Sequence, residues 1–232
     1  MLRLQVTNET SKLKAVVLGS AVNNGPTPSA DEAYDPKSLE HIRAGTYPLE
    51  PAMVSEMEAF NQVFQKYGVT VFRPKLIENY NQIFARDIGF VIGDVFIKSN
   101  ILPDRERELE AIQYVIDQIN AKKVVRPPEE VHIEGGDVML WNDYIFIGTY
   151  KGSDYKDYIT ARTNKEGVQY IKDLFPNKIV KDFDLVKSKI DSTMFETIEA
   201  LSSGNKSRAL ELFHQQIAKG EDAFYILSMY TY

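Results

Sequence analysis

The sequence predicts a mixed α/β fold followed by a small all-helical segment, and two observations carry this prediction. Strand-like apolar runs alternate with amphipathic helices over the first part of the chain. All 10 prolines lie between Pro26 and Pro176, whereas the stretch after Val186 contains no proline and has purely helical periodicity. This change in composition predicts two domains, residues 1–185 and residues 186–232.

The first predicted repeat consists of a strand, a long connection, a helix and a second strand. Residues 13–19 form an apolar run that ends at a glycine, and residues 23–51 form an irregular stretch of a length that is uncommon unless functional. Pro51 opens a helix with one apolar face, and residues 69–72 form a strand that an Arg-Pro pair closes. The apolar face consists of Met53, Met57, Phe60 and Phe64.

The second and third predicted repeats follow the same plan of helix, strand and turn. Residues 90–97 form a strand pair or one long strand, residues 103–119 a helix, and residues 124–125 a strand closed by a second Arg-Pro pair. Residues 168–175 and 179–180 form the helix and strand of the third repeat. The core side of the helix in the second repeat consists of Leu109, Ile112, Val115, Ile116 and Ile119.

Composition and charge exclude several classes of protein. The chain has 232 residues, of which 44% are hydrophobic and 26% charged, with a net charge of -6 and no basic run, so direct nucleic-acid binding is not expected. Its longest apolar runs are far too short for a membrane span. The N-terminus has no apolar signal-peptide core, which favours a cytoplasmic location.

The absence of cysteine has direct chemical consequences. With 0 cysteines the chain has no disulfide, no thiolate metal site and no cysteine nucleophile. We expect neither a metal nor another cofactor.

Two segments carry residues that could do chemistry. The first places Arg86 and Asp87 directly before the strand that starts near Phe90, and its alternative interpretation is an Arg–Asp ion pair that ties a loop to the sheet. The second places Glu134 and Asp137 on either side of two glycines, next to apolar strands. Acids rarely lie inside a protein unless they are paired, so this segment is either a solvated bulge or a carboxylate pair for a cationic ligand.

Together these segments resemble the guanidino-group-modifying superfamily, which includes amidinotransferases, arginine deiminases and dimethylarginine dimethylaminohydrolases. Residues 6–19 are similar to its first strand, and Asp35-Pro36-Lys37-Ser38 with Tyr47-Pro48 to the early loop of bacterial amidinotransferases. Residues 81–87 are similar to its Arg-Asp motif, and Glu134-Gly135-Gly136-Asp137 to its Glu-Gly-Gly-Asp motif. The resemblance covers about residues 1–185.

The resemblance implies a pseudo-symmetric α/β propeller of ββαβ repeats around an acidic centre. It implies that Asp87 binds the substrate guanidinium, with Arg86 and Asp137 also at the substrate, and that Glu134 orients a catalytic histidine. Carboxylates suit this task because they hold a planar guanidinium through two parallel hydrogen bonds. A cysteine thiolate then attacks the guanidinium carbon, and the histidine protonates the departing amine.

The sequence departs from this family after about Leu185. The expected histidine motif is replaced by Val186-Lys187-Ser188-Lys189-Ile190-Asp191, and no cysteine follows. His132, two residues before Glu134, would share its face of a strand and could reach the centre, although a histidine bonded within the sheet is the other interpretation. His41 is expected on the surface of the long loop, and His214 on the solvent side of a C-terminal helix.

The C-terminal segment predicts three short helices and resembles part of the bacterial DNA polymerase III delta subunit, a clamp-loader component. The similar stretch runs through residues 192–201 and 205–213 to residues 220–222. The second helix, residues 206–219, is expected to turn Leu210, Phe213 and Ile217 inward. An unrelated helical hairpin that docks on the open edge of the propeller is the alternative.

We therefore expect a truncated amidinotransferase- or deiminase-type protein for a small guanidino compound such as arginine. The chain alone is expected to be inactive, because the nucleophile and the histidine motif are absent. The alternatives are a non-catalytic guanidinium-binding pseudoenzyme and a clamp-loader-related interaction fragment. An incomplete propeller exposes strand edges, so the tail or a second chain, as a homo-oligomer or another protein, is expected to cover them.

Overall fold

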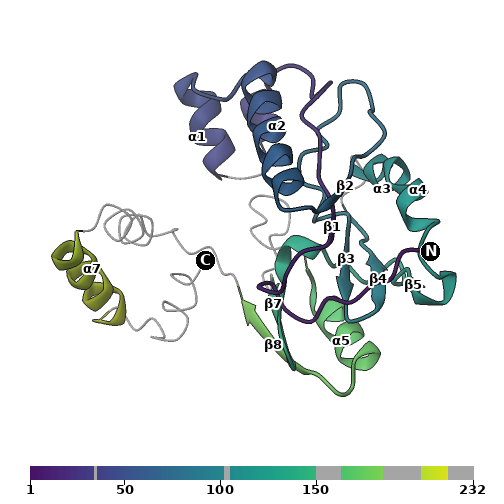
Figure 1. Cartoon of the computed structure of the whole chain (residues 1–232). Helices are drawn as coiled ribbons and strands as arrows, with labels where there is room; N and C mark the ends of the chain where they lie inside the picture. The colour runs from purple at the N-terminus through teal and green to yellow at the C-terminus, as the bar shows by residue number, and fades with distance from the viewer. Residues whose placement is uncertain (34–35, 102–104, 150–162, 185–204, 219–232) are drawn as a thin grey trace. The chain divides into compact units, whose positions relative to one another are not determined.

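The computed structural model describes the chain except residues 34–35, 102–104, 150–162, 185–204 and 219–232 (Figure 1). The chain divides into two compact bodies, an N-terminal body of Met1–Val186 and a C-terminal body of Lys187–Tyr232. Within the described ranges, no helix is both long and apolar enough to cross a bilayer.

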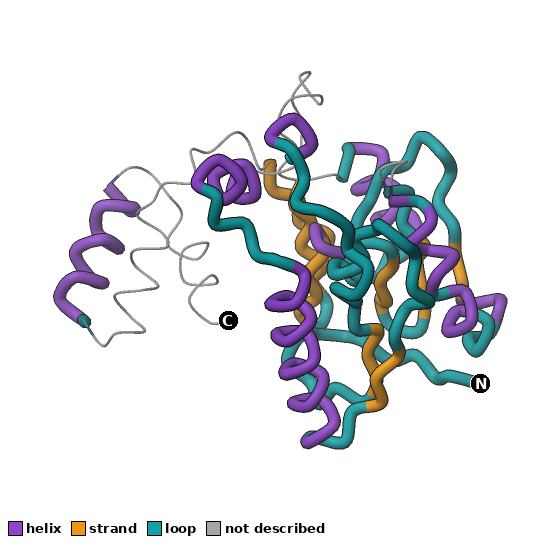
Figure 2. The backbone as a smooth tube through the Cα atoms, turned by 90° about the horizontal axis from the view of Figure 1, so that it is seen from above, coloured by secondary structure: helices purple, strands orange, loops and turns teal. Residues whose placement is uncertain are grey.

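The N-terminal body contains mixed α/β structure with many short elements. Figure 2 shows the strands as short segments between long loops. In chain order the helices and strands are β1 (Ala15–Val17), α1 (Pro36–Ala44), α2 (Glu50–Lys66), β2 (Thr70–Phe72), β3 (Gly89–Ile92), β4 (Val95–Lys98), α3 (Arg107–Ala111), α4 (Gln113–Ile116), β5 (Val124–Val125), β6 (Val138–Trp141), β7 (Tyr144–Thr149), α5 (Lys165–Leu174) and β8 (Ile179–Asp184). Three short 3-10 turns are η1 (Ala30–Glu32), η3 (Ala121–Lys123) and η4 (Gly135–Asp137).

The strands form three small sheets that repeat one plan. In the second repeat β3 and β4 pair antiparallel, and β5 returns after α3 and α4 to pair parallel with β4. The third repeat has the same order, with β6 and β7 antiparallel and β8 parallel to β7 after α5. The first repeat has only β1 and β2, which are parallel and separated by α2. The predicted internal repeat is thus confirmed.

The hairpins of the second and third repeats turn through equivalent two-residue loops. Gly93 (φ +61°) opens the loop between β3 and β4, and Asn142 (φ +54°) opens the loop between β6 and β7. Glycine and asparagine are the residues that tolerate such left-handed backbone at a hairpin turn. The two repeats can therefore be aligned on their turns, so that Ile92 corresponds to Trp141 and Val95 to Tyr144.

Two predictions about helices were wrong. The stretch 23–51, predicted to be irregular, contains α1, which Pro36 opens at a position where the missing N–H costs little. The single helix predicted for residues 103–119 is instead two short helices, because Ile112 has non-helical dihedrals (φ -106°, ψ 7°). The spacing of three from Leu109 to Ile112 and Val115 matches tighter winding, and Ile112 and Val115 each donate to the carbonyl three residues back.

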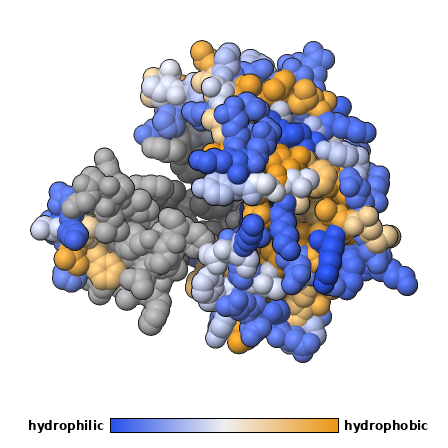
Figure 3. All heavy atoms as spheres, viewed as in Figure 1, coloured by the Kyte–Doolittle hydropathy of each residue, from blue (hydrophilic) through white to orange (hydrophobic). Residues whose placement is uncertain are grey.

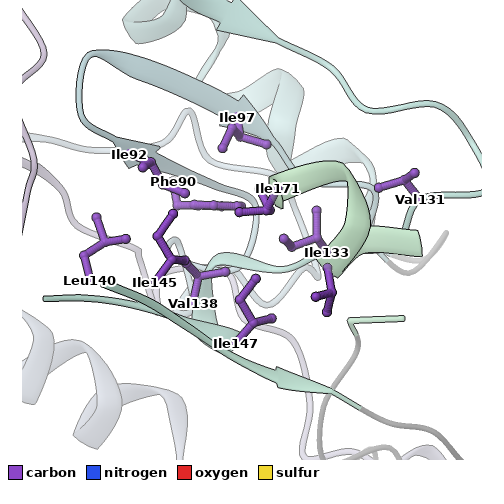
Figure 4. Packing of buried hydrophobic residues seen from close by; sticks show 11 residues of the cluster. Phe90, Ile92, Ile97, Val131, Ile133, Val138, Leu140, Ile145, Ile147 and Ile171 are labelled. Carbon is purple, nitrogen blue, oxygen red and sulfur yellow. The ribbon is translucent and has the colours of Figure 1, made fainter. Parts of the chain in front are cut away.

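Two apolar clusters hold the sheets together, and all five core residues predicted for the helix of the second repeat are buried. One cluster joins the α3 and α4 region to one face of the second sheet, through Ile88, Phe96, Leu109, Ile112, Ile116 and Ile119. The other lies between the second and third sheets and includes α5 (Figure 4). It consists of Phe90, Ile92, Ile97, Val131, Ile133, Val138, Leu140, Ile145, Ile147, Val168 and Ile171.

Apolar side chains are also exposed on the N-terminal body. Figure 3 shows apolar surface among mostly hydrophilic residues on one face. The predicted apolar face of α2 has no buried residue, although the rings of Phe60 and Phe64 contact each other at 4.4 Å between centroids. The outward face of the third sheet exposes Met139, Trp141, Tyr144, Ile179 and Phe183.

The described part of the C-terminal body is residues 205–218, with the helix α7 (Lys206–Ala218). Among the side chains of α7 that the structure describes, Ala209 and Leu212 are buried. Leu210 is exposed, so the prediction that Leu210 turns inward was wrong, and the side chain of Ile217 lies outside the described part. His214 is exposed, as predicted. The helices predicted near residues 192–201 and from residue 222 lie outside the described residues.

Two isoleucines on opposite faces of the third sheet provide a matched test of this packing. Ile145 is fully buried, whereas Ile179 is 44% exposed. We expect Ile145→Ala to lower the free energy of unfolding by about 2–5 kcal/mol, because it leaves a cavity in the core. Ile179→Ala should cost less than about 1 kcal/mol. Urea denaturation of both variants measures the difference, and equal losses would contradict the assigned faces.

Candidate functional site

Asp87 lies in a tight turn directly before β3. Its backbone amide donates to the carbonyl of Phe84 (3.1 Å), and its side chain is 18% exposed. Asp87 Oδ2 accepts a hydrogen bond from Nη1 of Arg105 (2.9 Å). The carboxylate predicted to bind a substrate guanidinium therefore contacts a guanidinium of the protein itself.

The Gly-Gly pair brings the second motif against the first. Gly135 is buried, and its amide faces the carbonyl of Asp87 at 3.4 Å. A Cβ atom at Gly135 would collide with the carbonyl oxygen of Arg86, and one at Gly136 would meet Oδ1 of Asp87. Gly135 is therefore required for the close approach of the two motifs, which a solvated bulge would not explain.

Arg86 binds groups other than Asp87. Its Nη2 and Nη1 donate to the two carboxylate oxygens of Glu9 (2.9 and 3.2 Å). Its Nε donates to the carbonyl of Gly135 (3.0 Å), and Nη2 also donates to the carbonyl of Val138 (2.7 Å). The ion pair between Arg86 and Asp87 is thus not formed. These contacts describe a structural tie between three segments and give no support to a substrate-binding role for Arg86.

Arg105 and Glu108 form a bidentate ion pair at this centre. Arg105 Nε and Nη2 donate to the two carboxylate oxygens of Glu108 at 2.7 and 3.1 Å, and Nη2 also faces the carbonyl of Phe84 at 3.3 Å. The Arg105 side chain is 13% exposed and that of Glu108 is buried. Such a pair fixes the guanidinium plane and therefore the position of the Asp87 carboxylate.

The pKa shifts show that the carboxylates share one electrostatic environment. Burial raises the pKa of Glu108, the hydrogen bond and charge of Arg105 lower it, and the nearby charges of Asp87 and Glu134 raise it further. For Arg105, burial alone would lower the pKa, but the hydrogen bonds and charges of Glu108 and Asp87 outweigh it and raise the pKa. Arg105 therefore binds both Glu108 and Asp87, and the charge of Glu134 acts on Glu108.

Glu134 and Asp137 are positioned by the start of α5. Glu134 is buried, and its amide faces Oγ1 of Thr163 (3.4 Å). The buried Thr163 hydroxyl donates to Oδ2 of Asp137 (2.7 Å). The next residue, Asn164, accepts from the amide of Gly167 (2.8 Å) and thereby caps α5.

His132 is bonded to the same segment through its backbone. Its amide donates to Oδ1 of Asn164 (3.1 Å), and its carbonyl accepts from the amide of Asn164 (3.0 Å). Residues 131–134 belong to no sheet ladder, so the strand alternation that predicted a shared face for His132 and Glu134 does not apply. His41 lies on α1 beside the Thr46 hydroxyl (2.9 Å).

Sequence reasoning missed Arg105, Glu108 and Thr163 at this centre, and it missed Glu9 as the partner of Arg86. Only Glu108 has a signal in the sequence, since it lies four residues before Ile112 on the core side of the predicted helix. Among the residues that the structure describes, no group of three or more His, Asp or Glu is arranged to hold a metal ion.

A separate cavity of about 270 Å³ lies at the start of α2. It is lined by Asn24, Tyr47, Glu50 and Met53 among others, and none of the carboxylates of the acidic centre lines it. The long connection of residues 23–51 thus contributes to a cavity.

Comparison with known proteins finds similarity in structure only. No family model and no curated protein matches the chain. Among solved structures, the amidinotransferase SxtG of Microseira wollei matches with a TM-score of 0.59 and 17% identity over 78% of this chain and 62% of that one. Inosamine-phosphate amidinotransferase StrB1 of Streptomyces griseus matches with a TM-score of 0.60 and 16% identity, over 82% of this chain and 65% of that one. A citrulline complex of the Pseudomonas aeruginosa dimethylarginine hydrolase DDAH matches with a TM-score of 0.55 and 16% identity, over 76% of this chain and 63% of that one.

The chain therefore has the fold of the guanidino-group-modifying enzymes, and the predicted resemblance is confirmed at the level of the fold. Amidinotransferases are among its neighbours, together with dimethylarginine and arginine hydrolases. The chain spans less than two thirds of the length of these structures. The predicted resemblance of the tail to the DNA polymerase III delta subunit receives no support.

Substitution of Gly135 and Gly136 tests how closely the Glu-Gly-Gly-Asp segment approaches Arg86 and Asp87. We expect Gly135→Ala to lower the free energy of unfolding by about 1–3 kcal/mol, because the new methyl group collides with backbone. Gly136→Ala meets only the end of the Asp87 side chain, which can rotate, so its loss of stability should be smaller. Thermal denaturation of both variants checks the order, and a larger loss for Gly136→Ala would contradict it.

Proposed function

We propose that the N-terminal body binds the guanidino group of an arginine-like compound at the acidic centre of Asp87, Glu134 and Asp137. The observation that carries this proposal is that Asp87 already holds a guanidinium, that of Arg105, where the two motifs meet. A carboxylate that accepts one guanidinium in a partly enclosed site has the geometry and charge to accept another.

The remaining acceptor on Asp87 gives the ligand a point of attachment. Oδ1 of Asp87 lies over Gly136, and none of the described residues donates a hydrogen bond to it. Glu134 adds negative charge that acts on Glu108, and the hydrogen bond from Thr163 orients Asp137. The neighbours named as amidinotransferases and dimethylarginine hydrolases support this choice of ligand class.

We further propose that residues 1–185 form an incomplete pseudo-symmetric propeller and that residues 186–232 form a separate helical segment. Two repeats with the same strand order support the first proposal, together with the parallel β1-α2-β2 arrangement. The division of the chain between Val186 and Lys187 supports the second.

The chain by itself is proposed to bind without catalysis. In the family that the sequence resembles, a cysteine thiolate forms the bond to the guanidinium carbon, and this sequence has 0 cysteines. Carboxylates alone can hold and orient the cation but cannot replace that nucleophile. The role that fits this chain is therefore a guanidinium-binding pseudoenzyme.

Binding should depend on Asp87. We expect isothermal titration with arginine or agmatine to show saturable binding that Asp87→Asn weakens at least tenfold, because a charge-assisted hydrogen bond to the guanidinium is lost. Asp117→Asn is the matched control, since Asp117 is an exposed aspartate on another surface. Unchanged affinity in Asp87→Asn would show that the ligand binds elsewhere, and no binding to folded protein would refute the proposal.

Turnover should be absent in the same preparation. We expect the pure chain to release no ornithine, citrulline or ammonia from arginine above the uncatalysed background, since loss of a nucleophile typically costs about 10⁴-fold or more in rate. Amino-acid analysis after prolonged incubation measures this. Sustained turnover that Asp87→Asn abolishes would contradict the non-catalytic role.

A further inference from the structure

Arg105 occupies one oxygen of the carboxylate that the proposed function assigns to the ligand. It uses four hydrogen bonds, two to Glu108, one to the carbonyl of Phe84 and one to Oδ2 of Asp87. A guanidinium has five N–H donors, so Arg105 is almost fully satisfied inside the protein.

An external guanidinium and Arg105 need the same atom. A parallel pair of hydrogen bonds to a carboxylate uses both of its oxygens, and Oδ2 of Asp87 is already taken. With Arg105 in place, only Oδ1 is open to a ligand, and the ligand must lie beside a like charge. Both effects lower affinity.

Arg105 makes more hydrogen bonds to Glu108 than to Asp87, so a ligand would break its contact with Asp87 first. Glu108 holds Arg105 through two hydrogen bonds, the shorter of them 2.7 Å, whereas Asp87 holds it through one of 2.9 Å. When Oδ2 is released, the guanidinium is still paired with the buried Glu108. The Arg105 and Asp87 side chains are also partly open to solvent, at 13% and 18%.

We propose that Arg105 is an internal guanidinium ligand of Asp87, and that an arginine-like compound must displace it from Oδ2 to bind with both oxygens. This inference rests on the proposed guanidinium-binding function. Glu108 acts in it as the group that retains Arg105 after displacement. The affinity of the site for its ligand is thus set by a competition inside the protein.

The test compares the full chain with a variant that lacks the internal ligand. Arg105→Gln alone leaves Glu108 buried without its cation, so Arg105→Gln/Glu108→Gln removes the pair together. Arg107→Gln is the matched control, because Arg107 is exposed and lies over the ring of Tyr80. Isothermal titration with arginine and agmatine at fixed ionic strength gives the dissociation constants, lysine serves as the ammonium control, and cooperative melting confirms folding.

The expected result is that the double variant binds arginine and agmatine at least tenfold more tightly than the unaltered chain, while Arg107→Gln leaves affinity unchanged. Adding Asp87→Asn to the double variant should remove the gain, and lysine should gain less. If the double variant does not melt cooperatively, Arg105→Gln alone is tested instead, and it should likewise bind arginine and agmatine at least tenfold more tightly than the unaltered chain.

Three results would overturn the proposal. Equal affinity in the unaltered chain and the variant would show that Arg105 does not compete, and the proposed function would stand. Weaker binding in the variant would show that Arg105 instead positions Asp87 for the ligand. No binding by either folded protein would overturn the proposed function and this inference together.

Discussion

The charge of one partly buried guanidinium makes the acidic centre of this fold possible. The charges of Asp87 and Glu134 act on Glu108, and burial disfavours the negative charge of Glu108. Arg105 offsets this cost through its bonds to Glu108 and Asp87. Without a cation at this position, the buried Glu108 would have to take up a proton or move into solvent. The guanidinium of Arg105 is therefore a part of the folded centre itself.

Backbone contact, more than side-chain packing, sets the position of the two motifs. Gly135 lies against the carbonyl of Arg86, and the Arg86 side chain reaches past it to the carbonyl of Val138 and to Glu9. The N-terminal segment, the turn before β3 and the turn before β6 are thus joined by one arginine. This arrangement explains why Arg86 and Asp87, adjacent in sequence, have different roles: the first joins segments and the second faces the centre.

The repeat and the two motifs could be predicted from sequence because both depend on local order. Strand, helix and turn recur in the same order along the chain. The spacing of Leu109, Ile112 and Val115 identifies the buried side of a helix. The role of Arg105 could not be predicted in this way. An Arg-x-x-Glu pair at the start of a helix is usually an exposed pair of little energetic weight, and only tertiary packing makes this one buried. The division of the helix at Ile112 was missed for a related reason, since it depends on winding that the apolar spacing alone does not specify.

The repeats also explain the exposed apolar face of the third sheet. When the two hairpins are aligned on their turns, Met139, Trp141, Tyr144 and Phe146 correspond to Phe90, Ile92, Val95 and Ile97 of the second sheet. The latter four pack in the cluster that the third repeat covers, whereas Met139, Trp141 and Tyr144 are exposed. The third sheet thus has the residue pattern of a sheet buried on both faces, with its own helix on one of them. A sheet with this pattern loses apolar contact on the face that is left open, so whatever covers that face would add to the stability of the whole body.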